Sequence, residues 1–185
     1  MAAVAAAETL PDEARILRRI RADVVPLALV ATVVVFAYVS TPADRYFPGK
    51  DPVDSMRGWP ALADSVEALR ETAGAAWVAT AQYETTGEFS FELRGRASVI
   101  PVTERARYTF QPPADAALLA RPALLVVREG ADLTPFRACF ASLSEVGTLA
   151  RLSSAGAVNY RYLAYRADGA VPGILVNGCD APPMR

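Results

Sequence analysis

The chain has 185 residues, with 19 basic and 20 acidic side chains and no histidine, so its net charge at pH 7 is −1. A nearly neutral chain lacks the excess of Lys and Arg that binds nucleic-acid phosphates, so we expect no nucleic-acid partner. Without histidine there is no His-based catalytic triad and no His-ligated metal site, two cysteines cannot build a zinc site alone, and no glycine-rich nucleotide motif occurs, so we expect no metal and no cofactor.

The first organised element is an apolar run between Asp23 and Asp44 that carries no charged residue. At about 1.5 Å per helical residue, a run of this length crosses the hydrocarbon core of a bilayer, which is about 30 Å thick. We therefore predict a transmembrane helix over 24–41. A buried core helix would alternate with polar positions, and a cleaved signal peptide would have a shorter and less acidic leader; both remain alternatives to the anchor.

The residues before the span, 1–23, form a predicted cytoplasmic leader. The leader contains an amphipathic juxtamembrane helix with Ile16, Leu17 and Ile20 on one stripe. Basic residues near a span favour the cytoplasmic side, and arginines crowd this leader more densely than basic residues follow the span. We therefore expect a single-pass protein of the cytoplasmic (inner) membrane, with the lipid bilayer as a partner, the N-terminus inside and the C-terminal domain extracytoplasmic.

A linker rich in Pro, Gly and Asp occupies 42–54, an extracytoplasmic domain occupies 55–170, and a C-terminal tail occupies 171–185. The domain opens with a helix from Ser55, whose apolar residues recur at spacings of three and four and which ends before Gly74. Short apolar runs bounded by turn residues predict buried strands at 75–80, 98–102 and 123–127.

The segment 82–93 is ambiguous between strand and helix. Phe89 and Phe91 alternate with polar residues as in a strand, while Tyr83, Gly87 and Phe91 recur at helical spacing.

The succession of these elements predicts the fold class. Helices between buried strands are typical of an α/β domain, and we predict a small three-layer domain with a mostly parallel sheet. Two alternating segments near the end of the chain, 147–154 and 159–169, predict an antiparallel C-terminal hairpin that closes one edge of the sheet.

The two cysteines of the chain, Cys139 and Cys179, both fall in the part predicted to lie outside the cytoplasm. An oxidising compartment would allow them to form a disulfide that ties the tail to the domain. Two unpaired cysteines are the alternative.

Four residues are weak candidates for binding. Glu84 and Glu88, with Glu92, recur at a spacing of four and would line one face of a helix, where they could contact a sugar or a partner; a solvated face is the simpler interpretation. Trp59 and Tyr83 could stack on a sugar, although core packing is the interpretation that we favour for both. No residue is assigned a catalytic role.

The pattern of these pieces carries a resemblance to a known family. The pieces are the apolar span, Gly58-Trp59 at the start of a helix, the strand and Tyr at 80–83, the piece at 88–93, the ALLVVRE strand and the closing YRYLAYRADG strand. Together, over residues 24–168, they resemble the C-terminal end of bacterial membrane glycosyltransferases of family 39, which is similar to protein O-mannosyltransferases and the lipid A aminoarabinose transferases. The resemblance implies a helix at 83–93.

The chain also departs from that family. Members have many membrane spans and an Asp-Glu pair in their first extracytoplasmic loop, whereas this chain has one span, and its nearest match, Asp44-Arg45-Tyr46, lacks the second acid. The resemblance therefore implies a non-catalytic, membrane-anchored C-terminal domain of a glycosyltransferase that uses polyprenyl-phosphate-linked sugars, with the multi-span catalytic part as its partner. The alternative is an independent bitopic cell-envelope protein whose α/β domain binds a ligand or a partner.

Overall fold

The computed structural model describes residues 15–40, 53, 56–111, 114–171, 173–174 and 178–179. The chain divides into two compact units, 1–53 and 54–185, and each unit is described by itself. Most of the predicted linker, the region around Asp44 and most of the tail lie outside the described residues.

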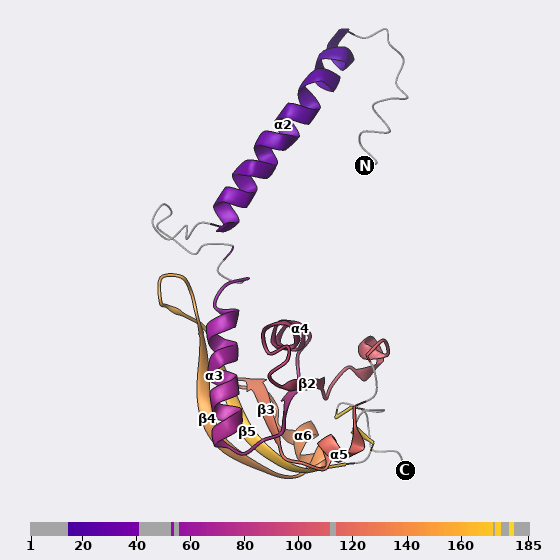
Figure 1. Cartoon of the computed structure of the whole chain (residues 1–185), viewed down its shortest axis with the longest axis vertical. Coiled ribbons are helices and arrows are strands. Elements are labelled where there is room, and N and C mark those ends of the chain that lie inside the picture. The colour runs from indigo at the N-terminus through magenta and orange to yellow at the C-terminus, as the bar shows by residue number, and fades with distance from the viewer. Residues whose placement is uncertain are drawn as a thin grey trace. The chain divides into compact units, whose positions relative to one another are not determined.

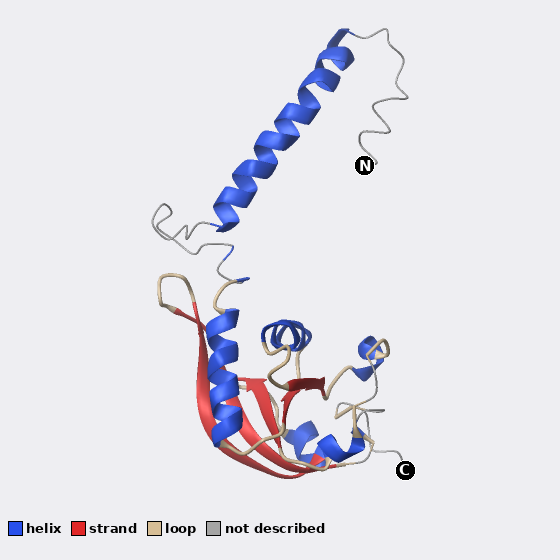
Figure 2. Ribbon diagram, in the orientation of Figure 1, coloured by secondary structure: helices blue, strands red, loops and turns tan. Residues whose placement is uncertain are grey.

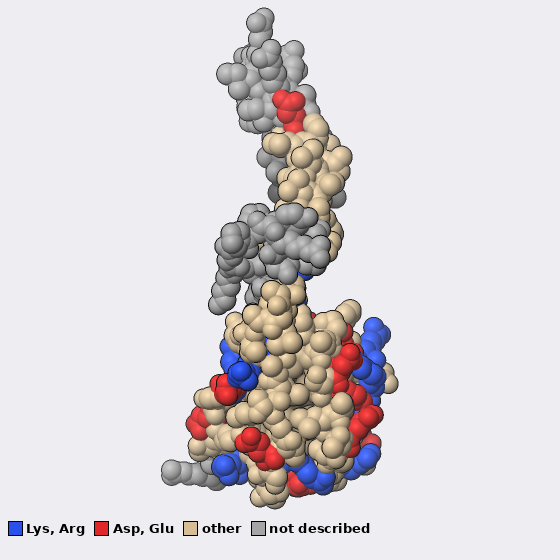
Figure 3. Space-filling view, turned by 90° about the vertical axis from the view of Figure 1, so that its left-hand side faces the viewer, with Lys and Arg blue, Asp and Glu red and all other residues tan. Residues whose placement is uncertain are grey.

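The first unit contains one long helix, α2 (Arg15–Ser40), labelled in Figure 1. Its window Asp23–Ser40 has a mean hydropathy of 2.1 and is long and apolar enough to cross a membrane. None of that window is buried, so the core-helix alternative is wrong, while the anchor and the signal peptide both remain compatible with the helix. Figure 3 shows residues 24–40 of this helix as an uncharged surface below one acidic residue. The predicted leader helix and the span form one continuous helix with Pro26 inside it.

The second unit, which we call the domain, contains a mixed five-stranded sheet in the order β2-β1-β3-β5-β4, drawn as one curved sheet in Figure 2. Its strands are β1 (Trp77–Thr80), β2 (Ser98–Pro101), β3 (Ala123–Arg128), β4 (Phe140–Leu152) and β5 (Val158–Ala170). β1 pairs in parallel with β2 and β3, while β5 pairs antiparallel with β3 and β4.

Parallel and antiparallel pairings are thus equally represented, and the predicted mostly parallel sheet is corrected to a mixed one. The difference comes from the hairpin of β4 and β5, in which each strand is 13 residues long. The hairpin begins at Phe140, well before the predicted 147. The prediction missed residues 141–146 because their side chains alternate only weakly between apolar and polar.

Each face of the sheet carries its own hydrophobic cluster. Residues at alternate positions of a strand point to opposite faces, so Val78 and Leu124 belong to one cluster and Trp77 and Leu125 to the other. The first cluster includes buried residues of α3 (Trp59–Thr72) and α4 (Tyr83–Glu92). The second includes residues of α6 (Thr134–Cys139) and the partly buried leucines of α5 (Ala116–Leu119). Fully burying one such apolar side chain contributes about 1.5–3 kcal/mol.

Helix α4 resolves the ambiguous segment 82–93. Phe89 and Leu93, four residues apart, are fully buried against the sheet, as expected for one face of a helix. Phe91, which would share their face in a strand, is 73% exposed. The strand-like alternation is therefore coincidental, and the helical spacing is the one that the fold uses.

One glycine fixes the start of α3 against the hairpin. Gly58 adopts a φ of 80°, a left-handed conformation that favours glycine, and a Cβ at this position would collide with the carbonyl oxygen of Leu152. This close approach places Trp59, the next residue, directly beneath the end of β4.

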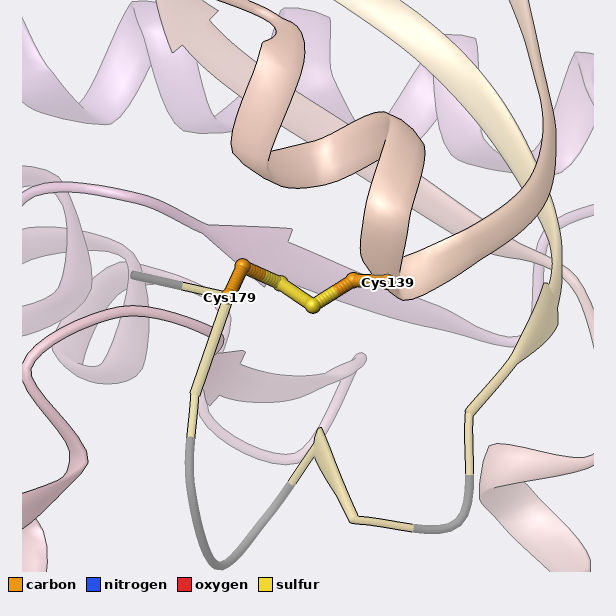
Figure 4. Close-up of a disulfide and its surroundings, with 2 residues drawn as sticks. All are labelled: Cys139 and Cys179. Carbon is orange, nitrogen blue, oxygen red and sulfur yellow. A yellow bond between two sulfur atoms is a disulfide. The ribbon is translucent and has the colours of Figure 1, made fainter. Parts of the chain in front are cut away.

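Cys139 and Cys179 form a disulfide, drawn in Figure 4. Cys139 is the last residue of α6, and Cys179 lies in the C-terminal segment, where its backbone N–H donates to the carbonyl of Val102 at 2.6 Å. Both side chains belong to the hydrophobic cluster on the α6 side of the sheet. The bond therefore joins the end of the chain to the core of the domain.

Candidate functional site

The candidate site lies where the parallel strands end. β1 ends at Thr80 and is followed at once by α4, which begins at Tyr83; the neighbouring strand β3 ends at Arg128. Because β5 runs antiparallel to β3, Tyr162 near its beginning lies directly opposite Arg128. Ligands of open α/β sheets bind outside the carboxyl ends of the parallel strands. Polar side chains at this edge are therefore the first candidates for binding a ligand.

An arginine cluster occupies this edge, formed by Arg128, Arg151, Glu84, Tyr160 and Trp59. The Arg151 side chain is 0% exposed, and its guanidinium lies between two rings, 4.2 Å from the Trp59 centroid and 4.7 Å from the Tyr160 centroid. Arg128 stacks on the same Tyr160 ring at 4.3 Å. Such cation–π contacts are strongest when the cation is desolvated, as Arg151 is here.

Glu84 joins the two arginines. Its Oε1 accepts a hydrogen bond from Arg151 Nη1 at 3.4 Å, and its Oε2 accepts one from Arg128 Nη2 at 3.2 Å. The side chains of Glu84 and Arg128 are about two-fifths exposed, so water reaches this pair although it does not reach Arg151. One carboxylate is thus shared between two guanidinium groups.

The Tyr162 hydroxyl is buried beside this cluster. Burial raises the pKa of Tyr162 and the charge of Glu84 raises it further, while the charges of Arg151 and Arg128 and a hydrogen-bonding contact from Arg128 lower it. The net shift is upward, so the hydroxyl stays protonated at neutral pH. It makes no hydrogen bond of standard geometry within the described part of the chain, and neither does the buried Nε of its neighbour Arg128.

A groove of about 670 Å³ runs along the outer side of α4, and we call it the α4 groove. From α4 it is lined by Tyr83, Glu84, Glu88 and Phe91, and Tyr108 of η3 (Arg105–Tyr108) lies opposite them with Phe110 just beyond. The Tyr83 and Tyr108 ring centroids are 6.4 Å apart. Tyr83, Phe91 and Phe110 are 65%, 73% and 79% exposed, which is unusual for aromatic side chains of a folded domain.

Glu88 also lines the groove and is half-buried. Burial raises its pKa, the charge of Glu92 raises it further, Arg151 lowers it, and Glu84 adds a further increase. The three glutamates therefore do share one face of α4, as their spacing predicts, and that face borders the arginine cluster. Glu84 is exposed, as on a solvated face, and its carboxylate also pairs with Arg128 and Arg151.

The structure brings three of the four sequence candidates together. Tyr83, Glu84 and Glu88 all line the α4 groove. The core packing that the sequence favours for Tyr83 is wrong, because Tyr83 is 65% exposed. Trp59 is separate: it is buried, its ring face is covered by Arg151, and its edge meets Phe89 at 6.1 Å between centroids. It packs in the core, as the sequence favours, and cannot stack on a sugar in this arrangement.

Sequence reasoning missed Arg128, Arg151, Tyr160 and Tyr162. Arg128 had a usable signal, because it directly follows an apolar strand at the end where α/β proteins bind ligands. Arg151 had a weaker one: strand alternation puts it on the same face as the buried Leu149. In the described residues no group of three or more His, Cys, Asp or Glu side chains is placed to hold a metal ion.

No family model, no curated protein and no solved structure matches this chain.

Proposed function

We propose that the chain is a non-catalytic, membrane-anchored C-terminal domain of a glycosyltransferase that uses polyprenyl-phosphate-linked sugars. In this proposal α2 crosses the cytoplasmic membrane, the domain lies on the extracytoplasmic side, and the chemistry belongs to a multi-span partner. The domain, a three-layer α/β fold with its sheet closed at one edge by the C-terminal hairpin, shapes and shields the cavity in which that partner works.

One observation carries the proposal. The residues of 82–93 alone left strand and helix open, and only the resemblance to family 39 implied a helix there. Helix α4 occupies Tyr83–Glu92 and presents Tyr83, Glu84 and Glu88 to the groove. Agreement at a segment where local pattern was uninformative supports the resemblance more strongly than agreement at strands that any apolar run predicts.

Two further features support the anchored, extracytoplasmic location. The apolar helix is unburied over its whole candidate window, as a segment surrounded by lipid would be. A disulfide between Cys139 and Cys179 persists in an oxidising compartment such as the periplasm and is rare in the cytosol.

The proposal is tested by sugar transfer in native membranes. Membranes from a host that lacks the chain should lose transfer from a radiolabelled polyprenyl-phosphate sugar, because the partner's cavity is left incomplete. Full-length chain should restore transfer, whereas residues 1–54, which keep the anchor and omit the domain, should not.

The purified chain alone provides the second arm of that test. It should release no lipid phosphate from polyprenyl-phosphate sugars above a buffer control, since one helix cannot enclose a lipid-carrier cavity. Turnover by the purified chain that disappears on Glu88→Gln or Asp44→Asn would contradict the non-catalytic assignment. Unchanged transfer in membranes without the chain would contradict the partnership.

A second candidate function is favoured by the arginine cluster. Charged side chains gathered at the carboxyl ends of parallel strands suit an independent bitopic envelope protein whose domain binds a small anionic ligand. This candidate predicts ligand binding by the chain with sugar transfer unaffected by its removal.

A further inference from the structure

The beginning of α4 has the properties of an anion site. The helix is ten residues long, starts immediately after β1, and receives no hydrogen bond from the side chain of its N-cap residue, Gln82. The first N–H groups of a helix lack partners within the helix and carry the positive end of its dipole. Anions, and phosphate groups above all, bind at such termini when they follow a parallel strand.

Arg128 brings a positive charge to the same place. Its Nη2 reaches the carboxylate of Glu84, a residue of the first turn of α4, at 3.2 Å. Charge-assisted hydrogen bonds to a carboxylate are normally about 2.7–2.9 Å, so Glu84 is held loosely by Arg128, and its bond to Arg151 at 3.4 Å is longer still. A shared carboxylate with two long contacts is easily displaced by a better acceptor.

The independent sign of a ligand is a buried donor. Tyr162 is 0% exposed, and its hydroxyl lies among the charges of Glu84, Arg128 and Arg151. Arg128 approaches this hydroxyl as a hydrogen-bond donor, and the hydroxyl's own proton meets no acceptor of standard geometry in the described residues. Buried donors are nearly always satisfied in native proteins, which indicates an acceptor that binds beside the Tyr162 hydroxyl.

We propose that the N-terminus of α4, Arg128 and Tyr162 bind a phosphate group, and that the Glu84 carboxylate occupies this site when no ligand is bound. The donors that this proposal assigns to the phosphate are the first-turn N–H groups, two nitrogens of Arg128 and the Tyr162 hydroxyl. They exceed what the two oxygens of a carboxylate accept well, whereas a phosphate offers at least three strong acceptor oxygens. The inference stands without the glycosyltransferase proposal.

The α4 groove gives the rest of a phosphorylated ligand a place to lie. Glu84 belongs both to the arginine cluster and to the groove lining, so a phosphate that displaces its carboxylate remains continuous with the groove. The exposed rings of Tyr83 and Phe91 then supply an apolar surface beside the phosphate site.

The test uses the full chain in phosphatidylcholine nanodiscs. Thermal unfolding is followed by tryptophan fluorescence in increasing inorganic phosphate, with chloride at matched ionic strength as the reference. Both tryptophans of the chain, Trp59 and Trp77, belong to the domain, so the signal reports its unfolding alone. We expect a saturable rise in Tm with phosphate and none with chloride.

Matched variants locate the site. Arg128→Ala and the conservative Tyr162→Phe should each weaken phosphate binding at least tenfold, and Glu84→Gln should tighten it several-fold because the competing carboxylate is gone. The controls Arg161→Ala, at an exposed position of β5, and Glu92→Gln, at the far end of α4, should bind as wild type does. Equal phosphate responses in wild type and Arg128→Ala, or weaker binding by Glu84→Gln, would overturn the proposal.

A further arm separates the two sources of a phosphate group. Nanodiscs that contain phosphatidylglycerol should protect the wild-type domain more than the Arg128→Ala domain if the ligand is a lipid headgroup. Protection by inorganic phosphate alone, without this lipid dependence, assigns the site to a soluble phosphorylated ligand. Absence of both effects contradicts phosphate binding here.

Discussion

Replacing Cys139 or Cys179 by Ser should lower the free energy of unfolding of the domain by about 4 kcal/mol. The disulfide joins residues with a sequence separation of 40, and in the chain-entropy model a cross-link that closes a loop of this length removes that much entropy from the unfolded chain. The C-terminal segment would also lose its attachment to the core on the α6 side. Urea unfolding of the detergent-solubilised chain, followed by tryptophan fluorescence, measures the effect.

The controls separate the bond from the packing of the two thiols. Cys139→Ser, Cys179→Ser and the double variant should show the same loss, because any one of them removes the bond. A reductant should destabilise wild type by the same amount and leave the double variant unchanged. Wild type that resists reductant and matches the double variant in urea would contradict a disulfide between these residues.

Arg151→Ala should cost about 3 kcal/mol of the domain's stability, the second largest effect that we expect. The substitution removes a fully buried side chain, leaves a cavity between the Trp59 and Tyr160 rings, and deprives Glu84 of one of its two cationic partners. The same urea titration provides the measurement.

Arg161→Ala is the matched control for this prediction. Arg161 lies on the neighbouring strand β5 with an exposed side chain, so its loss should change the stability by no more than about 0.5 kcal/mol. Arg151→Met, which keeps most of the buried apolar contact, should recover part of the loss. An Arg151→Ala variant as stable as Arg161→Ala would contradict the prediction, because it would show that the contacts of the buried guanidinium add nothing to the free energy of unfolding.

The elements predictable from the sequence were those whose local pattern agrees with their tertiary role. Strands β1, β2 and β3 are apolar on both faces because helices or the C-terminal segment cover both, and their apolar runs locate them closely. Helix α3 has an apolar stripe at helical spacing for the same reason, since one face meets the sheet. In these segments local sequence and packing demand the same structure.

Segments that pack partly against the core and partly against solvent were harder to predict. In α4, Phe89 packs in the core while Phe91 lines the groove. These two aromatic residues, separated by one polar residue, produce the alternating pattern that is typical of a strand. The first half of β4 is an exposed edge whose alternation is weak, which hid its pairing with β5 and the mixed character of the sheet. The apolar and polar pattern of a segment says little about its secondary structure where much of the segment is exposed to solvent.

The arginine cluster could not be assembled from sequence because its members come from five separate elements. The five members are Trp59 at the start of α3, Glu84 in the first turn of α4, Arg128 at the end of β3, Arg151 next to the end of β4, and Tyr160 in β5. Only the fold brings them together. The face of Arg151 could have been inferred from its alternation with Leu149. Its two aromatic neighbours could not, because Trp59 reaches it only through the close approach of Gly58 to Leu152.

The central claim, a membrane-anchored domain on the extracytoplasmic side, is tested most directly by protease added to intact spheroplasts. The chain carries an N-terminal tag for detection, so that a cleaved signal peptide would be recognised by separation of tag and domain without protease. We predict that the tag stays with the membrane-bound full chain, and that protease removes the domain and leaves a small protected fragment containing α2. A domain that is digested only after the cytoplasmic membrane is opened, or that is released without protease, would contradict the claim.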